Sequence, residues 1–168
     1  MKTLDLEIID SPIGKVFLAM DGDKLCTLDF EDFQPRQRQL LTRHYGEYRM
    51  LERARRSETG ERVLAYFAGE LNAIDGIAVT TGGTEFQQQC WQALRRIAAG
   101  TTASYAEQAK LIGKPKAMRA VGMSNGRNPV AIVVPCHRVI GANGTLTGYG
   151  GGLWRKEWLL RHEGVQLN

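Results

Sequence analysis

A cysteine, a histidine and an arginine directly follow a proline at the end of an apolar segment, in the stretch Pro135-Cys-His-Arg-Val139. A thiolate is a strong nucleophile, and a nearby base or positive charge converts a thiol into one. Neighbouring side chains on extended backbone point apart, so only a water, or a turn after Pro135, could connect Cys136 with His137. The histidine would also need an acceptor on its other ring nitrogen, and Glu163 is the plausible carboxylate.

Three other uses of Cys136 compete with that of a nucleophile. Most unpaired cysteines are small buried hydrophobic residues, and residue types and spacing favour the nucleophile over this alternative only slightly. A zinc site needs about four closely spaced ligands, and the three cysteines and three histidines show no such cluster. A redox couple needs a second cysteine, as in C-x-x-C, which the sequence lacks. We therefore predict no metal and no cofactor.

The composition is that of a soluble globular protein, with 43% hydrophobic and 24% charged residues in 168. The sequence contains neither a run of about 18 apolar residues nor a cleavable apolar N-terminal stretch, which argues against a membrane-spanning helix and a signal peptide. An odd number of widely spaced cysteines (Cys26, Cys90 and Cys136) is typical of a reducing compartment, so we expect a cytoplasmic protein.

Charge is distributed unevenly along the chain. Residues 1–80 hold 11 basic and 14 acidic residues, a net charge of −3, whereas residues 81–168 hold 11 basic and 4 acidic residues, a net charge of +7. A basic half is expected of a phosphate-binding surface, although a merely solvated basic face has the same composition. The composition changes at residues 80–84, so we predict two domains, residues 1–80 and 81–168.

The elements of the first domain follow from its periodicity. Apolar and polar residues alternate near residues 4–8, 16–19 and 25–30, with turn sequences between them, which predicts a meander of antiparallel strands. Helical patterns follow over about 35–45 and 59–68. The first domain is therefore predicted to be an α/β structural domain.

The second domain is predicted to be mostly helical. Two capping boxes, Thr84 with Gln87 and Ser104 with Glu107, open helices that extend to about residues 97 and 112. A further helix over about 116–124 follows a tight Gly-Lys-Pro turn. This pair of short helices indicates a helix-turn-helix, although a helical hairpin inside a core would look similar. The basic residues on or beside its second helix favour nucleic acid: Lys114, Lys116, Arg119 and Arg127.

Two more elements complete the second domain. The apolar run Val130–Val134 is predicted to be a buried strand that ends on the cysteine. A final helix over about 153–161 is predicted to bury one apolar face, formed by Leu153, Trp154, Trp158 and Leu159.

The stretch Pro135–Val139 resembles the signature of the O6-alkylguanine-DNA alkyltransferases, also called methylated-DNA–protein-cysteine methyltransferases. Other matching segments occur in the same order over roughly residues 84–164: Ser104-Tyr105, Arg119-Ala-Val-Gly122, Asn125-Gly-Arg-Asn-Pro129, Thr147-Gly-Tyr-Gly-Gly-Gly152 and Lys156-Glu-Trp-Leu-Leu-Arg-His-Glu163. The first 80 residues match more loosely, and the length resembles that of the stand-alone bacterial form. The resemblance implies an α+β fold, with an RNase H-like N-terminal domain and a winged-helix-like C-terminal domain for DNA binding and alkyl transfer.

The resemblance also implies a reaction, the irreversible transfer of an alkyl group from O6-alkylguanine in duplex DNA to Cys136. Because the thioether is stable, each molecule would act once. His137 would act as base through a water, Glu163 would hold His137, and Asn128 would brace the turn around Cys136. Tyr105 would donate to ring N3 of the flipped base. Further substrate contacts are implied for Val139, Tyr149, Gly150 and Gly151.

In this family the second helix enters the minor groove, which implies little sequence specificity. Arg119 would fill the vacated stack, and the small residues Ala120 and Gly122 would allow close approach. DNA contacts are also implied for Lys114, Lys116 and Arg127. The glycines of residues 148–152 suggest a roomy, mobile pocket wall that admits bulkier alkyl groups or O4-alkylthymine.

Two alternatives remain beside this hypothesis. One is a non-catalytic protein that binds alkyl lesions, although such relatives lack the cysteine. The other is a DNA-binding regulator, for which no effector domain is visible. Some relatives carry a structural zinc, but its N-terminal ligands are not visible here. We expect a monomer, with clustering on DNA left open.

Overall fold

The computed structural model describes residues 1–167, which form two compact units. The N-terminal unit consists of residues 1–82 together with residues 129–133. The C-terminal unit consists of residues 83–128 and the chain from Val134 to the end of the described residues. The chain passes from one unit to the other within residues 80–84, where the composition changes.

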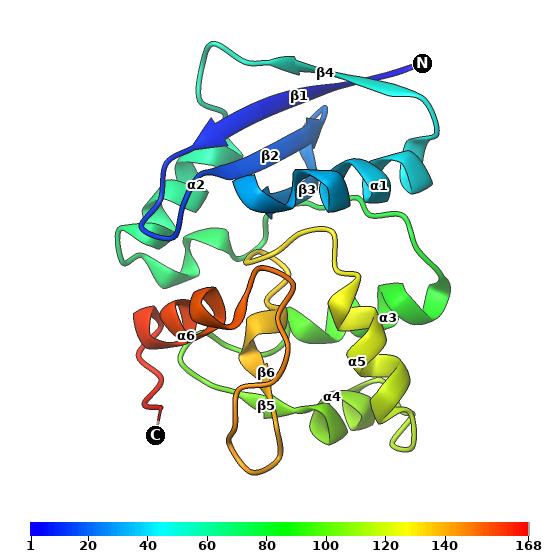
Figure 1. Ribbon diagram of the computed structural model, residues 1–168, viewed down its shortest axis with the longest axis vertical. Coiled ribbons are helices and arrows are strands. Elements are labelled where there is room, and N and C mark those ends of the chain that lie inside the picture. The colour runs from blue at the N-terminus through cyan, green and yellow to red at the C-terminus, as the bar shows by residue number, and fades with distance from the viewer. Residues whose placement is uncertain (168) are drawn as a thin grey trace. The chain divides into compact units, whose positions relative to one another are not determined.

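A four-stranded sheet with the order β3-β2-β1-β4 forms the N-terminal unit (Figure 1, blue to cyan). Strands β1 (Lys2–Ile9), β2 (Val16–Asp21) and β3 (Lys24–Phe30) pair antiparallel, which confirms the predicted hairpins. Strand β4 (Tyr48–Glu52) pairs parallel to β1, so the prediction of an entirely antiparallel sheet was wrong. A helical connection between β3 and β4 carries the chain back to the start of β1, as parallel pairing requires.

Helix α1 (Gln34–Tyr45) covers one face of this sheet. Its Leu41 packs in a buried apolar cluster with Leu4, Ala19 and Cys26, so Cys26 is a core residue. The buried amide of Gln37 on the same helix donates to the carbonyl of Phe17 at 2.9 Å. The helical elements of the unit are η1 (Glu31–Phe33), α1 (Gln34–Tyr45), α2 (Glu58–Phe67) and η2 (Leu71–Ile74).

The apolar run before the cysteine is buried as predicted, but it is not a strand. Val130 forms a single isolated bridge with Leu28, and the chain then turns through residues 131–133. Ile132 has a φ of 71°, outside the extended region that a strand requires. Prolines at 129 and 135 bracket the run, and proline cannot donate to a sheet ladder.

Helices dominate the C-terminal unit (Figure 1, green to red). Both predicted capping boxes are present, with Thr84 and Ser104 accepting from the backbone N–H three residues on. Gly113, with a φ of 73°, ends the first short helix, and its partner begins two residues later than predicted. The elements are α3 (Glu85–Leu94), β5 (Ala103–Ser104), α4 (Tyr105–Leu111), α5 (Met118–Gly126), η3 (Cys136–Arg138), β6 (Val139–Ile140) and α6 (Leu153–His162).

The buried face of α6 differs from the predicted one. Leu159 is fully buried as expected, but Leu153 and Trp154 are 49% and 55% exposed. The buried positions of the first two turns are instead occupied by Arg155 and Lys156. These cations reach backbone carbonyls, so polar contacts displace the tryptophan from the interior.

Residues 1–167 lack two kinds of feature. No helix there combines the length and apolar character needed to cross a membrane. No group of three or more histidine, cysteine, aspartate or glutamate side chains is arranged to hold a metal ion.

Candidate active site

Cys136 lies at the first position of a three-residue 3-10 turn, directly after Pro135. Its backbone N–H donates to the carbonyl of Val134 at 2.9 Å, so the chain bends sharply at the cysteine. The side chain is half-buried and borders a pocket of about 280 Å³. Elements far apart in the sequence supply the other residues that line this pocket: Tyr105, Gly122, Asn125, Gly126, Gly148, Tyr149 and Gly150.

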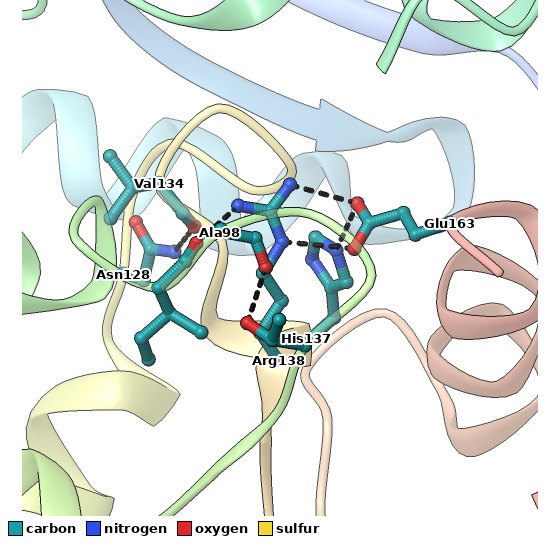
Figure 2. A network of polar contacts seen from close by, with 8 residues as sticks. Ala98, Asn128, Val134, His137, Arg138 and Glu163 are labelled. Atoms are coloured by element: carbon teal, nitrogen blue, oxygen red, sulfur yellow. Dashed lines mark hydrogen bonds and ion pairs between the residues drawn. The ribbon is translucent and has the colours of Figure 1, made fainter. Parts of the chain in front are cut away.

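The two residues after the cysteine enter a buried ionic network (Figure 2). Glu163 is the C-cap residue of α6, and its carboxylate faces both His137 and Arg138. Glu163 Oε2 lies 2.9 Å from His137 Nε2, while Arg138 donates from Nε to Oε1 at 2.9 Å and from Nη2 to Oε2 at 3.0 Å. Arg138 Nη1 also donates to the carbonyl of Ile97 at 2.7 Å. The predicted His137–Glu163 contact is therefore present.

The electrostatics of this network favour a neutral imidazole beside an ionised carboxylate. Burial raises the pKa of the Glu163 carboxyl, but hydrogen bonds from His137 and Arg138 and the positive charge of Arg138 outweigh it and hold the pKa well below the usual range. Burial lowers the pKa of His137 against the opposing effect of Glu163. Because a carboxylate only accepts, His137 Nε2 must carry the hydrogen and Nδ1 the lone pair. His137 Nδ1 is buried and has no hydrogen-bond partner among residues 1–167.

Three amide side chains hold the elements around the pocket in place. Asn128 Nδ2 donates to the carbonyl of Val134 at 2.7 Å, the geometry expected of a brace for the cysteine turn (Figure 2). Asn125 and Gln108 exchange two hydrogen bonds, at 2.9 and 2.7 Å, and so join α5 to α4. Both members of this amide pair are buried, and Asn125 also lines the pocket.

The glycine-rich loop that forms one pocket wall is anchored by cations of α6. Lys156 Nζ donates to the carbonyls of Val139 and Thr147, at 2.6 and 2.8 Å. Arg155 Nη1 donates to the carbonyl of Gly151 at 3.1 Å. Lys156 is fully buried, and burial lowers its pKa to about 8, although the charge of Cys136 opposes this shift.

The predicted substrate-binding residues divide into two groups. Tyr105, Tyr149 and Gly150 lie in the wall of the pocket that contains Cys136. The carbonyls of Val139 and Gly151 already accept hydrogen bonds from Lys156 and Arg155, respectively. The structure thus places the first group around the thiol. The second group provides the carbonyls that accept hydrogen bonds from the cations of α6.

The predicted DNA-binding residues, apart from Gly122, are exposed. Lys114 and Lys116 precede α5, Arg119 and Ala120 lie on it, and Arg127 is its C-cap residue. Gly122 instead lines the pocket, where an added Cβ would lie 3.7 Å from the Tyr105 ring.

Sequence reasoning missed four residues around the site. Arg138, Lys156, Arg155 and Thr147 were assigned no role, although each bonds to a predicted site residue or its loop. The position of Arg138 directly after His137 was a usable signal. The two cations of α6 gave none, because a basic residue on a helix is most often solvated.

Comparisons with known proteins agree with this geometry. The sequence profile described as "6-O-methylguanine DNA methyltransferase, DNA binding domain" matches residues 85–165. The chain is 48% identical over 164 residues to a methylated-DNA–protein-cysteine methyltransferase of Salmonella typhimurium, which covers 96% of each chain. It is 47% identical over 157 residues to the protein of that name from Methanosarcina acetivorans, which covers 94% of this chain and 96% of the relative.

Solved structures show the same likeness. The chain resembles the crystal structure of Mycobacterium tuberculosis OGT in complex with DNA, with a TM-score of 0.80 and 44% identity over 95% of this chain and 92% of that one. It also resembles an O6-methylguanine-DNA methyltransferase from the archaeon Pyrococcus kodakaraensis, with a TM-score of 0.75 and 26% identity over 96% of this chain and 99% of that one.

Proposed function

This chain belongs to the methylated-DNA–protein-cysteine methyltransferase family, and we propose that it repairs duplex DNA by moving the alkyl group of O6-alkylguanine to Cys136. One observation carries this proposal: Cys136 borders a pocket and is followed by a buried, neutral His137. Glu163 holds the Nε2 of this histidine, which leaves Nδ1 to accept a proton. Non-catalytic lesion binding is not favoured, because this constellation serves thiol activation rather than recognition.

The proposed transfer is a displacement at the alkyl carbon. The thiol gives its proton to His137 Nδ1 through a water, and the sulfur attacks the carbon. The S–C bond forms while the C–O6 bond breaks, and the electron pair leaves with the guanine, which takes up a proton. Tyr105 donates to ring N3 of the departing base, and Asn128 holds the turn that aims the sulfur. Because the S–C bond of the thioether is stable and the thiol is not regenerated, the protein acts once.

A titration tests the proposed stoichiometry. With a duplex that contains one O6-methylguanine, the number of repaired lesions should rise linearly with the amount of protein added. Each protein molecule should repair one lesion and then stop. Continued repair at excess DNA would show turnover, and no repair by folded protein would refute the proposal.

The same titration with O6-benzylguanine and O4-methylthymine measures the range of substrates. We expect benzyl transfer at a rate comparable to that of methyl transfer, because the pocket wall has open space at Gly148. A Cβ added to this glycine would meet no other atom within 4 Å.

We further propose that the N-terminal unit is a structural domain and that the C-terminal unit is a domain that binds DNA and transfers the alkyl group. The predicted domains, residues 1–80 and 81–168, differ from these units mainly at residues 129–133, which belong to the N-terminal unit. The strand order 3-2-1-4, with β1 and β4 parallel, supports an RNase H-like topology for the first. Helices α4 and α5 support a winged-helix-like arrangement with a helix-turn-helix for the second. The cytoplasmic location stays a prediction.

DNA is the proposed partner, with α5 in the minor groove and Arg119 in the place of the flipped base. Met123 lies one helical turn from Arg119 and is 62% exposed, while Met118 at the start of the helix is 47% exposed. Exposed apolar side chains among basic ones suit a minor groove, where apolar wedges unstack base steps. Lys114, Lys116 and Arg127 are placed to contact phosphates.

Measurements of DNA binding at several salt concentrations distinguish phosphate contacts of basic residues from apolar contacts of the methionines. Lys116→Ala should weaken binding and reduce the slope of log affinity against log salt by about 1, because one phosphate contact is lost. Met123→Ala should weaken binding at an unchanged slope, since it releases no counterion. Lys24→Ala, an exposed lysine of the other unit, is the control. An equal effect of all three substitutions would contradict the assignment.

A further inference from the structure

The hydroxyl of Tyr105 has a neighbour that the proposed mechanism leaves unused. Tyr105 Oη lies 2.9 Å from Thr147 Oγ1, across 42 residues of sequence. Tyr105 begins α4, whereas Thr147 lies in the loop between β6 and α6, and both side chains are half-buried. The contact therefore joins the helix-turn-helix to the pocket loop at Tyr105 Oη, the atom that is proposed to donate to the flipped base.

Thr147 is itself held in place by a buried cation. Lys156 Nζ donates to the Thr147 carbonyl at 2.8 Å and to the Val139 carbonyl at 2.6 Å. No carboxylate within residues 1–167 forms an ion pair with this fully buried ammonium. Threonine is also stiff at χ1, so a fixed backbone leaves its hydroxyl few positions. The position of Oγ1 is thus set by the same lysine that ties the loop to β6.

The direction of the hydrogen bond follows from what a phenol can do. Tyr105 has one hydrogen to donate, and its oxygen can accept. If Tyr105 donates to a ring nitrogen of the base, the Thr147 hydroxyl must be the donor to Tyr105. Such a chain orients the phenol hydrogen away from Thr147, and a donor that also accepts is a stronger donor.

We infer that Thr147 is a positioning residue, which donates to the Tyr105 oxygen and turns the Tyr105 O–H toward the flipped base. This inference rests on the proposed function of Tyr105. Thr147 itself exchanges no proton with the base and forms no bond to the alkyl group. Its hydroxyl acts only through Tyr105, so its effect should vanish when the phenol oxygen is absent.

Single-turnover transfer at saturating protein tests this inference. Thr147→Val, which keeps the shape and removes the hydroxyl, should slow transfer about 5- to 10-fold, the size expected for one neutral hydrogen bond. Thr147→Ser should restore most of the rate. In a Tyr105→Phe background, Thr147→Val should cause no further loss. Affinity for the lesion duplex should stay unchanged in the two Thr147 variants, because Thr147 itself does not contact the base.

A matched control lies in the same loop. Thr145 Oγ1 bonds to Asn143 Oδ1 at 2.7 Å, and Thr145→Val should leave the transfer rate unchanged. An unchanged rate in Thr147→Val, failure of Thr147→Ser to restore it, or an equal loss in the Tyr105→Phe background would each overturn the inference. An unfolded Thr147→Val would do so as well, because it would show a structural role. Failure of the unsubstituted protein to transfer would instead refute the proposed function.

Discussion

Replacing Arg138 with methionine will lower the free energy of unfolding by about 3–5 kcal/mol at pH 7, the cost of breaking a buried ion pair from one side. Arg138 gives Glu163 two hydrogen bonds in a fully buried setting, so its loss leaves a carboxylate with too few donors. Urea denaturation of both proteins measures the difference.

The pH dependence of this difference has a defined sign. The pKa of Glu163 is held well below its usual range, so the carboxylate stabilises the fold above about pH 4.3, and this contribution is lost as the pH falls further. The difference in unfolding free energy between the two proteins should therefore narrow below about pH 4.3, because only the unsubstituted protein loses the stability that the Arg138–Glu163 pair provides.

An exposed ion pair on the same helix is the control. Arg161 and Glu157 pair at 3.0 Å with half-exposed side chains, and Arg161→Met should cost less than about 1 kcal/mol. Equal costs for the two substitutions would show that the Arg138–Glu163 network has no special weight in the fold.

Replacing His137 with glutamine will slow alkyl transfer by about 100- to 10,000-fold, the usual contribution of a general base. Glutamine can still donate to Glu163, so the fold should persist. Burial lowers the pKa of His137, and a base acts when neutral, so the unsubstituted protein should keep its rate to somewhat below about pH 6.5. The variant should instead speed up toward about pH 8.5, where an unassisted thiol ionises.

His162→Gln is the matched substitution. His162 stacks on Trp158 at 4.6 Å between ring centroids, on α6 and outside the proposed proton path. Its rate and pH profile should follow those of the unsubstituted protein. If both histidine variants slow alike, or if His137→Gln keeps the original pH profile, His137 is not the base.

The parts of the site that depend on local chemistry could be predicted from the sequence. Glu163 was predicted because a histidine base needs a carboxylate acceptor and residues 81–168 hold only 4 acidic residues, and the structure pairs it with His137 and Arg138. Capping boxes placed α3 and α4 at their first residues, because caps are local signals.

The predictions that failed depended on contacts between distant segments. Strand β4 was missed because it is short and most of its residues are exposed, so only its pairing with β1 identifies it. Trp154 was assigned to the interior because apolar residues usually face the core, whereas carbonyls of the pocket loop select Arg155 and Lys156 for that face. The turn at Ile132 could have been anticipated from the prolines on both sides.

Peptide mass mapping after incubation with an O6-methylguanine duplex tests directly whether Cys136 accepts the alkyl group. We expect the protein to gain the mass of one methylene at Cys136, and we expect Cys136→Ser to gain nothing while it still binds the duplex. A methyl group on Cys26, Cys90 or any other residue, or methylated DNA left intact beside equimolar folded protein, would contradict this expectation.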